Sequence, residues 1–277
     1  MERYRLIRIH LIESFDDPSL EPYRTMRRQL DHRQKQIFVA EGEKIVRRLL
    51  ESDFIVVSVL LPQRWFQAFE PLLNVRAEEI QVYVADKELL ETLTGFSMYQ
   101  GVLAVGKIPK LASVETVLQE SARPYLFAAV DGITSADNLG VLVRNCVAFG
   151  AQALFVGETS SSPYLRRAVR SSMGAIFRLP VVEVTGLAGT LSGLSHKMIR
   201  CIAAHPHTRQ TLLPQADLAG DCCLVFGSEG AGLSRQILEL CDEAVAIPMQ
   251  AGVDSLNVGN AGAVFLYEAN RQRGKYQ

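Results

Sequence analysis

The sequence predicts an α/β protein with two domains, and the larger, C-terminal domain is expected to hold a mostly parallel sheet with helices on both faces. Two observations support this. Six apolar runs in the second half of the chain are strand-like, and helical patterns separate several of them. Near-continuous apolar strands are typical of parallel sheets that are covered on both faces. The length of 277 residues suits two domains of ordinary size.

The first part of the chain follows the same alternation after a charged N-terminal extension. We expect strands at 37–40, 55–61, 80–84 and 101–105, and helices at 43–51, 65–73 and 87–93. This alternation predicts a small α/β domain. We therefore assign residues 1–106 to the extension and the small domain, 107–121 to a linker, and 122–277 to the second domain.

The second domain is predicted in more detail because its helices carry terminal signals. The expected strands are 126–130, 153–156, 177–184, 199–204, 222–226 and 244–247, and the expected helices are 139–149, 163–173, 234–240 and 258–272. Asp137 or Asn138 could cap the first of these helices, with Gly150 at its end. Ser234 and Asn257 are suited to cap the last two, and a serine before Pro163 to cap the short one.

Composition narrows the classes of function. The net charge of −1 gives no general attraction to nucleic acid, so an RNA-binding surface would have to be a local patch. The five cysteines include no C-x-x-C pair and most lie in apolar or helical runs, which indicates buried thiols, not disulfides or zinc ligands. His205 and His207 have no nearby ligand cluster, so we expect no metal site.

The chain shows no signal for export or membrane insertion. Charges are scattered through the first 15 residues, and no uncharged apolar run is long enough to span a membrane. We therefore expect a cytoplasmic protein.

Three glycine-containing or polar runs each follow a predicted strand and lead into a helix. They are DNLGVLVRN (137–145), VFGSEGAGLS (225–234) and IPMQAGVDSLNVGNAG (247–262). Loops at the carboxyl ends of parallel strands commonly form ligand sites, and glycine lets the main chain approach a ligand closely. The second run lacks the pattern of a phosphate-binding loop or a nucleophile elbow. Capping could explain Asn138 and Asn257, and a surface charge could explain Arg144.

Taken together, the three runs resemble the signature motifs of the SpoU/TrmH-type RNA ribose 2′-O-methyltransferases of the SPOUT superfamily. The resemblance covers roughly residues 125–277, and a weaker one extends over the preceding domain. One position departs from the pattern, because Gly259 stands where the family usually has serine. The matching residues are Asn138, Arg144, Gly227, Glu229, Gly230, Pro248, Leu256, Asn257 and Val258.

The resemblance implies a fold, a cofactor and a set of site residues. It implies a C-terminal trefoil knot, a homodimer formed through the helices of the knot, and S-adenosyl-L-methionine as cofactor. Arg144 would be the catalytic arginine, acting as a base or stabilising charge, with Asn138 and Glu229 beside it. Main-chain groups of Gly227, Ile247 and Leu256 would bind the cofactor, with Gly230 and Asn257 in the same loops. Leu256 and Met249 are apolar residues suited to the faces of its adenine ring, although core packing could also explain them.

Basic residues outside the motifs are candidates for RNA contacts, although a solvated helix face would also explain them. Arg166, Arg167 and Arg170 share one predicted helix, and Arg47 and Arg48 share another. The resemblance implies structured RNA as substrate, ribosomal RNA first and transfer RNA second. A non-catalytic RNA-binding relative is an alternative because of Gly259. An enzyme acting on small molecules is a further alternative, which the basic clusters and the first domain disfavour.

Overall fold

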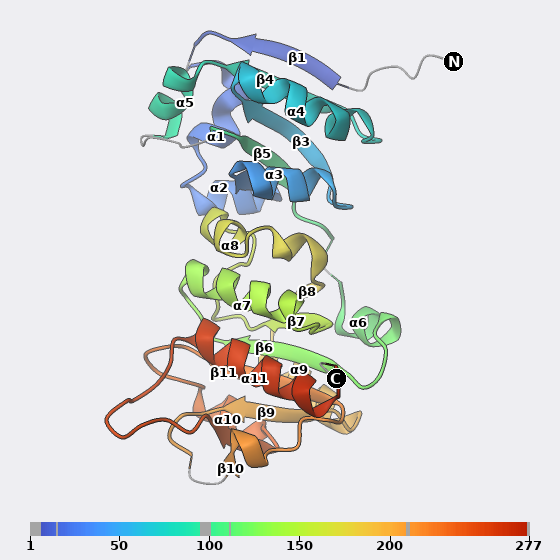
Figure 1. Cartoon of the computed structure of the whole chain (residues 1–277), viewed down its shortest axis with the longest axis vertical. Coiled ribbons are helices and arrows are strands. Elements are labelled where there is room, and N and C mark those ends of the chain that lie inside the picture. Colours follow the sequence, from blue (N-terminus) through green and yellow to red (C-terminus); the bar gives the residue numbers. More distant parts are fainter. Residues whose placement is uncertain (1–6, 15, 95–100, 111, 209–210, 276–277) are drawn as a thin grey trace. The chain divides into compact units, whose positions relative to one another are not determined.

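The computed structural model describes residues 7–14, 16–94, 101–110, 112–208 and 211–275 (Figure 1). The chain forms two compact units. The first unit comprises Met1–Lys110 and Tyr164–Phe177, and the second comprises Leu111–Pro163 and Arg178–Gln277. The segment Tyr164–Phe177 thus belongs to the first unit, although the sequence placed it in the second domain.

The first unit contains a five-stranded sheet in the order β1-β4-β3-β5-β2. Its strands are β1 (Ile7–Ile12), β2 (Ile37–Glu41), β3 (Val56–Leu61), β4 (Ile80–Ala85) and β5 (Leu103–Lys107). Its helices are α1 (Glu21–Arg24), α2 (Gln29–Gln34), α3 (Glu43–Leu50), α4 (Gln63–Asn74), α5 (Lys87–Thr94) and α8 (Arg166–Ser171). The predicted strands and helices of this part are confirmed, and the charged extension supplies an unexpected edge strand, β1.

Aromatic side chains attach the segment Tyr164–Phe177 to the rest of the first unit. Phe177 lies 5.7 Å from Phe38 and 5.3 Å from Phe54 between ring centroids, and Tyr164 lies 6.0 Å from Phe38. Arg166 of α8 also donates to Glu41 of β2. The serine cap predicted for this helix is wrong, since Leu165 precedes it with no side-chain cap bond.

The second unit contains a seven-stranded, wholly parallel sheet in the order β10-β12-β9-β11-β6-β7-β8. The strands are β6 (Leu126–Asp131), β7 (Ala153–Val156), β8 (Val181–Glu183), β9 (Arg200–Ala204), β10 (Thr211–Leu212), β11 (Cys222–Gly227) and β12 (Glu243–Ala246). The helices are α6 (Val114–Glu120), α7 (Ala136–Ala148), α9 (Leu187–His196), α10 (Arg235–Leu240) and α11 (Val258–Gln272). The predicted fold class is confirmed.

Helices cover both faces of this sheet. Successive side chains of a strand point to opposite faces, and because the strands are mostly apolar, both faces need a helical layer. Val225 of β11 packs in a core with Val117 of α6, Leu191 of α9 and Ile237 of α10. The next residue, Phe226, points to the other face, where its ring lies 5.9 Å from that of Phe265 of α11. Figure 1 shows α7 and α11 lying side by side along the sheet, as the contacts between these two helices require.

Two predictions for the second unit are wrong, and one helix was not predicted. Ser135, and neither Asp137 nor Asn138, caps α7 by accepting from the Asn138 amide. The expected strand 177–184 is a 3₁₀ helix (Ala175–Arg178) followed by the short β8, because Phe177 packs into the first unit. The helix α9 was missed because Gly189 and Gly193 mask its leucine periodicity.

The cysteines follow the expectation from sequence. All five are free thiols, and all but the half-buried Cys241 are fully buried. Burial raises the pKa of Cys222 to about 11 and that of Cys146 to about 12. Along the described parts of the chain, no helix has the length and apolarity needed to cross a membrane.

Candidate functional site

The three motifs meet at one edge of the parallel sheet of the second unit, the first of them within the helix α7 and the other two in loops. They follow β6, β11 and β12, whose carboxyl ends all lie at this edge because the strands are parallel. The fourth strand in this part of the sheet is β9, which lies between β12 and β11. Residues that follow these four strands are therefore brought together, although up to 120 residues separate them in sequence.

One side chain joins the three motifs. Asn257 Nδ2 donates to Asn138 Oδ1 at 3.0 Å and to Glu229 Oε1 at 2.6 Å. Asn257 Oδ1 accepts from the Gly259 amide at 2.9 Å and so caps α11, as the sequence predicts. Asn138, Glu229 and Asn257 thus form a connected polar cluster, which lies at the surface and is open to a large substrate.

The second motif is a tight loop in which two glycines have different roles. A Cβ at Gly227 would lie 2.2 Å from the Gly232 carbonyl carbon and 2.3 Å from the Leu233 nitrogen, so only glycine fits. The Ser228 and Gly232 amides each donate to the other residue's carbonyl oxygen at 3.0 Å, which closes the loop. At Gly230, in contrast, an added Cβ would meet no atom within 4 Å.

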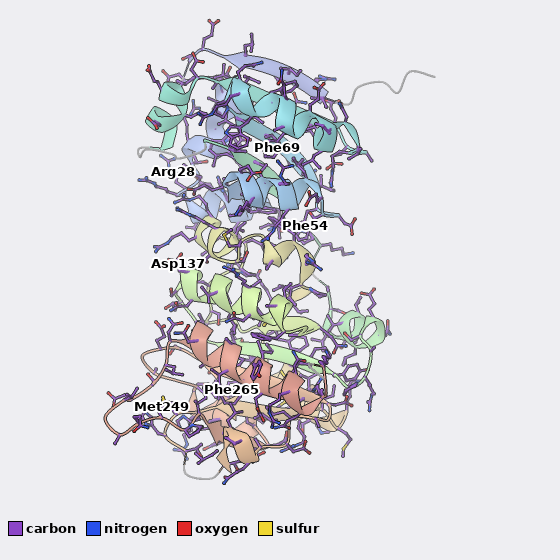
Figure 2. All side chains as sticks on the ribbon, in the orientation of Figure 1. Arg28, Phe54, Phe69, Asp137, Met249 and Phe265 are labelled. Atoms are coloured by element: carbon purple, nitrogen blue, oxygen red, sulfur yellow. The ribbon has the colours of Figure 1, made fainter. Side chains whose placement is uncertain are left out.

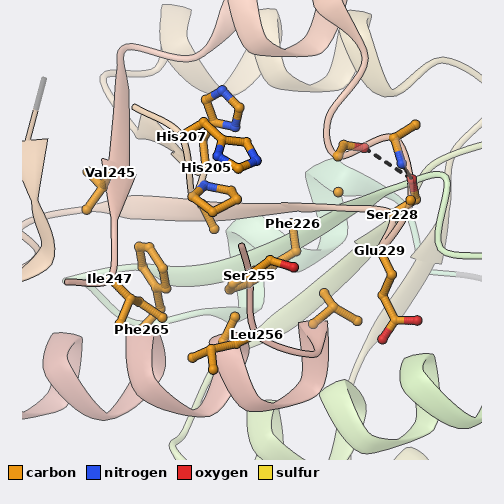
Figure 3. A pocket seen from close by; sticks show the side chains of 18 of the residues that line it. His205, His207, Phe226, Ser228, Glu229, Val245, Ile247, Ser255, Leu256 and Phe265 are labelled. Carbon is orange, nitrogen blue, oxygen red and sulfur yellow. Dashed lines mark hydrogen bonds between the residues drawn. The ribbon is translucent and has the colours of Figure 1, made fainter. Parts of the chain in front are cut away.

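A cavity of about 210 Å³ lies beside this loop (Figure 3). One part of its wall is apolar and suits the faces of a flat ring. Main-chain groups of the glycine loop supply hydrogen-bonding atoms, and Glu229 supplies a carboxylate. The apolar lining residues include Phe226, Val245, Ile247, Met249, Leu256 and Phe265, and the polar ones are His205, His207, Ser228, Glu229 and Ser255.

All the residues predicted to bind the cofactor, except Asn257, line this cavity. Gly227, Gly230, Ile247, Met249 and Leu256 come from the second and third motifs. Leu256 keeps 37 % of its surface exposed, which leaves its side chain available to a ligand. Asn257 stands next to this wall and positions Glu229.

Arg144 lies on α7 and is exposed. Within the described residues, no hydrogen bond or ion pair engages its guanidinium, and its neighbour Asn145 fixes α7 to α11 by donating to the Gly259 carbonyl oxygen at 2.6 Å. The structure therefore does not join Arg144 to the polar cluster directly. It leaves the guanidinium free to reach a substrate.

The five arginines predicted to bind RNA all belong to the first unit, and most of their guanidinium groups are already bonded to other groups of that unit. Arg166 and Arg170 both pair with Glu41, the latter at 3.2 Å. Arg47 pairs with Glu43 at 3.0 Å, and its guanidinium lies 5.2 Å from the centroid of the Phe69 ring. Arg48 donates to the Met173 carbonyl oxygen, while Arg167 is exposed.

Several cavity residues were not predicted from the sequence. Phe226, Val245, Ser255, Phe265, His205 and His207 all contribute to the wall. The two histidines follow an apolar strand, which is a signal, but the strand order that places them here is not readable from the sequence. In the described parts of the chain, no group of three or more His, Cys, Asp or Glu residues could hold a metal ion.

The chain is similar to known proteins over most of its length. The model of the SpoU rRNA methylase family matches residues 125–267. An uncharacterised tRNA/rRNA methyltransferase of Mycobacterium tuberculosis is 32% identical over 266 residues, which cover 92% of this chain and 90% of the relative. The 23S rRNA (guanosine-2′-O-)-methyltransferase RlmB of Pectobacterium atrosepticum is 32% identical over 247 residues, 84% of this chain and 97% of its own.

A solved structure agrees over almost the whole chain. The SpoU methyltransferase AviRb of Streptomyces viridochromogenes, in complex with the cofactor AdoMet, superposes with a TM-score of 0.80 at 27% identity. The match covers 94% of this chain and 100% of that one.

Proposed function

Because the chain belongs to the SpoU rRNA methylase family, we propose that it transfers a methyl group from S-adenosylmethionine to a ribose 2′-hydroxyl of ribosomal RNA. The observation that carries this proposal is the Asn257 side chain, which binds residues of both other motifs next to a ligand-sized cavity. The RlmB relatives favour ribosomal RNA over transfer RNA as substrate.

The residues of the cavity fit the proposed cofactor. Its adenine ring suits the apolar faces of Leu256, Ile247 and Met249, and its polar edges suit main-chain groups of the glycine loop. At Gly230 the space beside the main chain is open, so a ligand can approach where a side chain would interfere. When bound, S-adenosylmethionine supplies an activated methyl group on a positively charged sulfur.

The chain itself must align the ribose hydroxyl and handle its proton. Arg144 is exposed on α7 and suited to stabilise the negative charge that develops on the 2′-oxygen. Arginine keeps its proton in proteins, so a role as base would require a perturbed site or help from an RNA phosphate. Asn257 holds Glu229 and Asn138 in place, and Glu229 would supply a carboxylate on the cavity wall for the cofactor's positive charge.

The departure from the family pattern at Gly259 has a packing explanation. A Cβ at Gly259 would lie 2.6 Å from Val141 Cγ1, so glycine here accommodates valine on the facing helix α7. The missing hydroxyl therefore reflects how α7 and α11 pack. The amides that hold the polar cluster are retained.

The sequence also predicts a basic surface in the N-terminal region, and its exposed members are suited to bind RNA phosphates. Arg28, Arg33 and Lys44 are exposed, and Arg28 projects at the surface in Figure 2. Charge reversal at Arg28 and Arg33 is expected to weaken RNA binding and lower its salt dependence without changing cofactor affinity. Unchanged RNA affinity in a filter-binding salt titration would remove this surface from the proposal.

The exposed apolar residues of α11 support a homodimer. Val264 and Tyr267 are 38 % and 50 % exposed and lie three residues apart, so they share one helix face. Val258 and Phe265 of the same helix are buried in the unit's own core and are not available for this contact. Ribosomal RNA as substrate also implies that the enzyme works in the cytoplasm.

The proposed function is tested by identifying the methylated atom. Purified protein is incubated with unmodified ribosomal RNA and S-adenosylmethionine carrying a labelled methyl group, and the RNA is digested to nucleosides for mass spectrometry. The expected product is one 2′-O-methylnucleoside. A label on a nucleobase, or incorporation into transfer RNA alone, would contradict the proposal.

A further inference from the structure

Two imidazole rings lie on the cavity wall and have no role in the function described so far. His205 directly follows β9, and His207 is two residues further on. The His205 amide donates to the Val245 carbonyl oxygen of β12 at 3.0 Å, and the His205 carbonyl oxygen accepts from the Thr208 amide at 3.3 Å. These bonds hold the turn, so the rings are presented from an anchored backbone.

The rings are placed as a pair. Their centroids are 6.0 Å apart and their planes are nearly perpendicular, at 88°. Both line the cavity, His205 half-buried and His207 exposed. Among the described residues, no other group hydrogen-bonds to the ring nitrogens of either histidine, so these nitrogens can bind a ligand.

Charged and donor groups are distributed unevenly on the wall. His205 and His207 are the only residues among those lining the described cavity whose side chains carry a nitrogen donor, and Glu229 is the only carboxylate. Figure 3 shows the imidazoles and Glu229 at separate places on the wall, with Phe226 between them and Leu256 on the side away from the histidines. The wall therefore has a donor region, an acidic region and an apolar region.

This pattern matches the charges of S-adenosylmethionine, and the inference rests on the proposed function. The cofactor has a flat nucleoside end, a positively charged sulfur and an amino-acid end with a carboxylate. We propose that His205 and His207 bind that carboxylate through their ring N–H groups. Glu229 then lies toward the positive sulfur, and the apolar wall lies toward the adenine. The two histidines determine how tightly the amino-acid end is held and take no part in methyl transfer.

The test compares two ligands that differ only in this end. S-Adenosylhomocysteine has the amino-acid end, whereas 5′-methylthioadenosine has the same nucleoside thioether without it. Affinities are measured by calorimetry for the full chain and for His205→Ala, His207→Ala, the double variant and the conservative His205→Gln. His196→Ala is the matched control, because His196 lies on α9 outside the cavity and bonds to its own helix at the Ser192 carbonyl oxygen.

The expected result is selective. The double variant should bind S-adenosylhomocysteine about tenfold or more weakly, the loss expected for charge-assisted hydrogen bonds, and 5′-methylthioadenosine equally well. His205→Gln should restore part of the loss, and His196→Ala should change nothing.

Two outcomes would overturn the inference while leaving the proposed function intact. Equal losses for both ligands would mean that the rings contact the nucleoside, and unchanged affinities with weakened RNA binding would mean that they contact RNA phosphates. If the unmodified chain bound neither S-adenosylmethionine nor S-adenosylhomocysteine, the proposed function itself would be wrong.

Discussion

Among single residues, Asn257 combines two roles in one amide group. Its oxygen caps α11, and its nitrogen links Asn138 with Glu229. Aspartate would keep the first role, because it is as good an N-cap as asparagine. It would lose the second role, since it has no N–H to donate and would place a second carboxylate beside Glu229.

The substitution Asn257→Asp should therefore separate folding from function. We expect the midpoint of thermal unfolding to change little and methyl transfer to fall about tenfold or more, from the loss of hydrogen bonds to a charged group. Circular dichroism and a methyl-transfer assay on the same preparation check this. Full activity in the aspartate variant would show that the polar cluster does not organise the site.

Gly259 offers a second test at the same scale. Gly259→Ser should lower the free energy of unfolding by ~1–3 kcal/mol, because the added Cβ overlaps the stiff side chain of Val141. Adding Val141→Ala should recover much of this loss. Gly193→Ser is the control, since a Cβ there meets no atom within 4 Å. Urea denaturation that shows no cost for Gly259→Ser would contradict the packing explanation.

At the level of secondary-structure elements, α8 shows that the first unit is not a continuous piece of sequence. Tyr164 and Phe177 pack on Phe38 and Phe54, and Arg166 pairs with the buried Glu41. A fragment that begins near residue 112 would therefore lack the partners of the segment Tyr164–Phe177. Variants of the full chain are better suited than deletion to separate RNA binding from cofactor binding.

Glu41→Gln should strongly destabilise the protein. Arg166 keeps only 16 % of its side-chain surface exposed, so removing the charge of its partner leaves a largely buried guanidinium unpaired. Losses of ~3–5 kcal/mol are typical of such changes. The matched control is Glu239→Gln, which breaks the exposed pair with Arg235 and should cost less than about 1 kcal/mol. Equal effects of both variants in chemical denaturation would refute the structural role of Glu41.

The exposed face of α11 leads to a prediction about assembly. Tyr267→Glu combined with Val264→Glu should shift the protein from dimer to monomer, because two charges would have to be buried in the interface. Sedimentation at micromolar concentration measures this shift, with Arg123→Ala, which lies before the amino end of β6 and outside α11, as a control. A monomer already in the unmodified protein would rule out the proposed dimer.

At the scale of the whole molecule, most strands of both sheets and the three motifs could be predicted because they depend on local pattern, whereas β1 and β10 were not predicted and β8 only as part of a longer strand. Alternating apolar runs gave β6, β7, β9, β11 and β12 to within a residue or two at each end. The cap of α11 at Asn257 followed from residue type alone.

Features that depend on contacts distant in sequence could not be predicted. The partner of Arg166 lies 125 residues away, and nothing near α8 in the sequence indicates that it packs on β2. Likewise, α6 was included in the linker, although Val117 is buried in the core of the second unit. The placement of His205 depends on the strand order β12-β9-β11, which the sequence order does not reveal. The predicted knot and the division at 107–121 stay predictions.

The most direct test of the central claim, RNA ribose methylation at the site formed by the three motifs, is a single-turnover assay of Arg144→Ala at saturating RNA. The transfer rate should fall a hundredfold or more, a loss of ~2.7–4 kcal/mol in stabilisation of the developing oxyanion, while calorimetry shows unchanged affinity for S-adenosylmethionine. Arg144→Lys should restore little because it lacks the planar fork of donors. Arg123→Ala should transfer at the normal rate. If Arg144→Ala retained most of the rate, the proposed mechanism would be wrong.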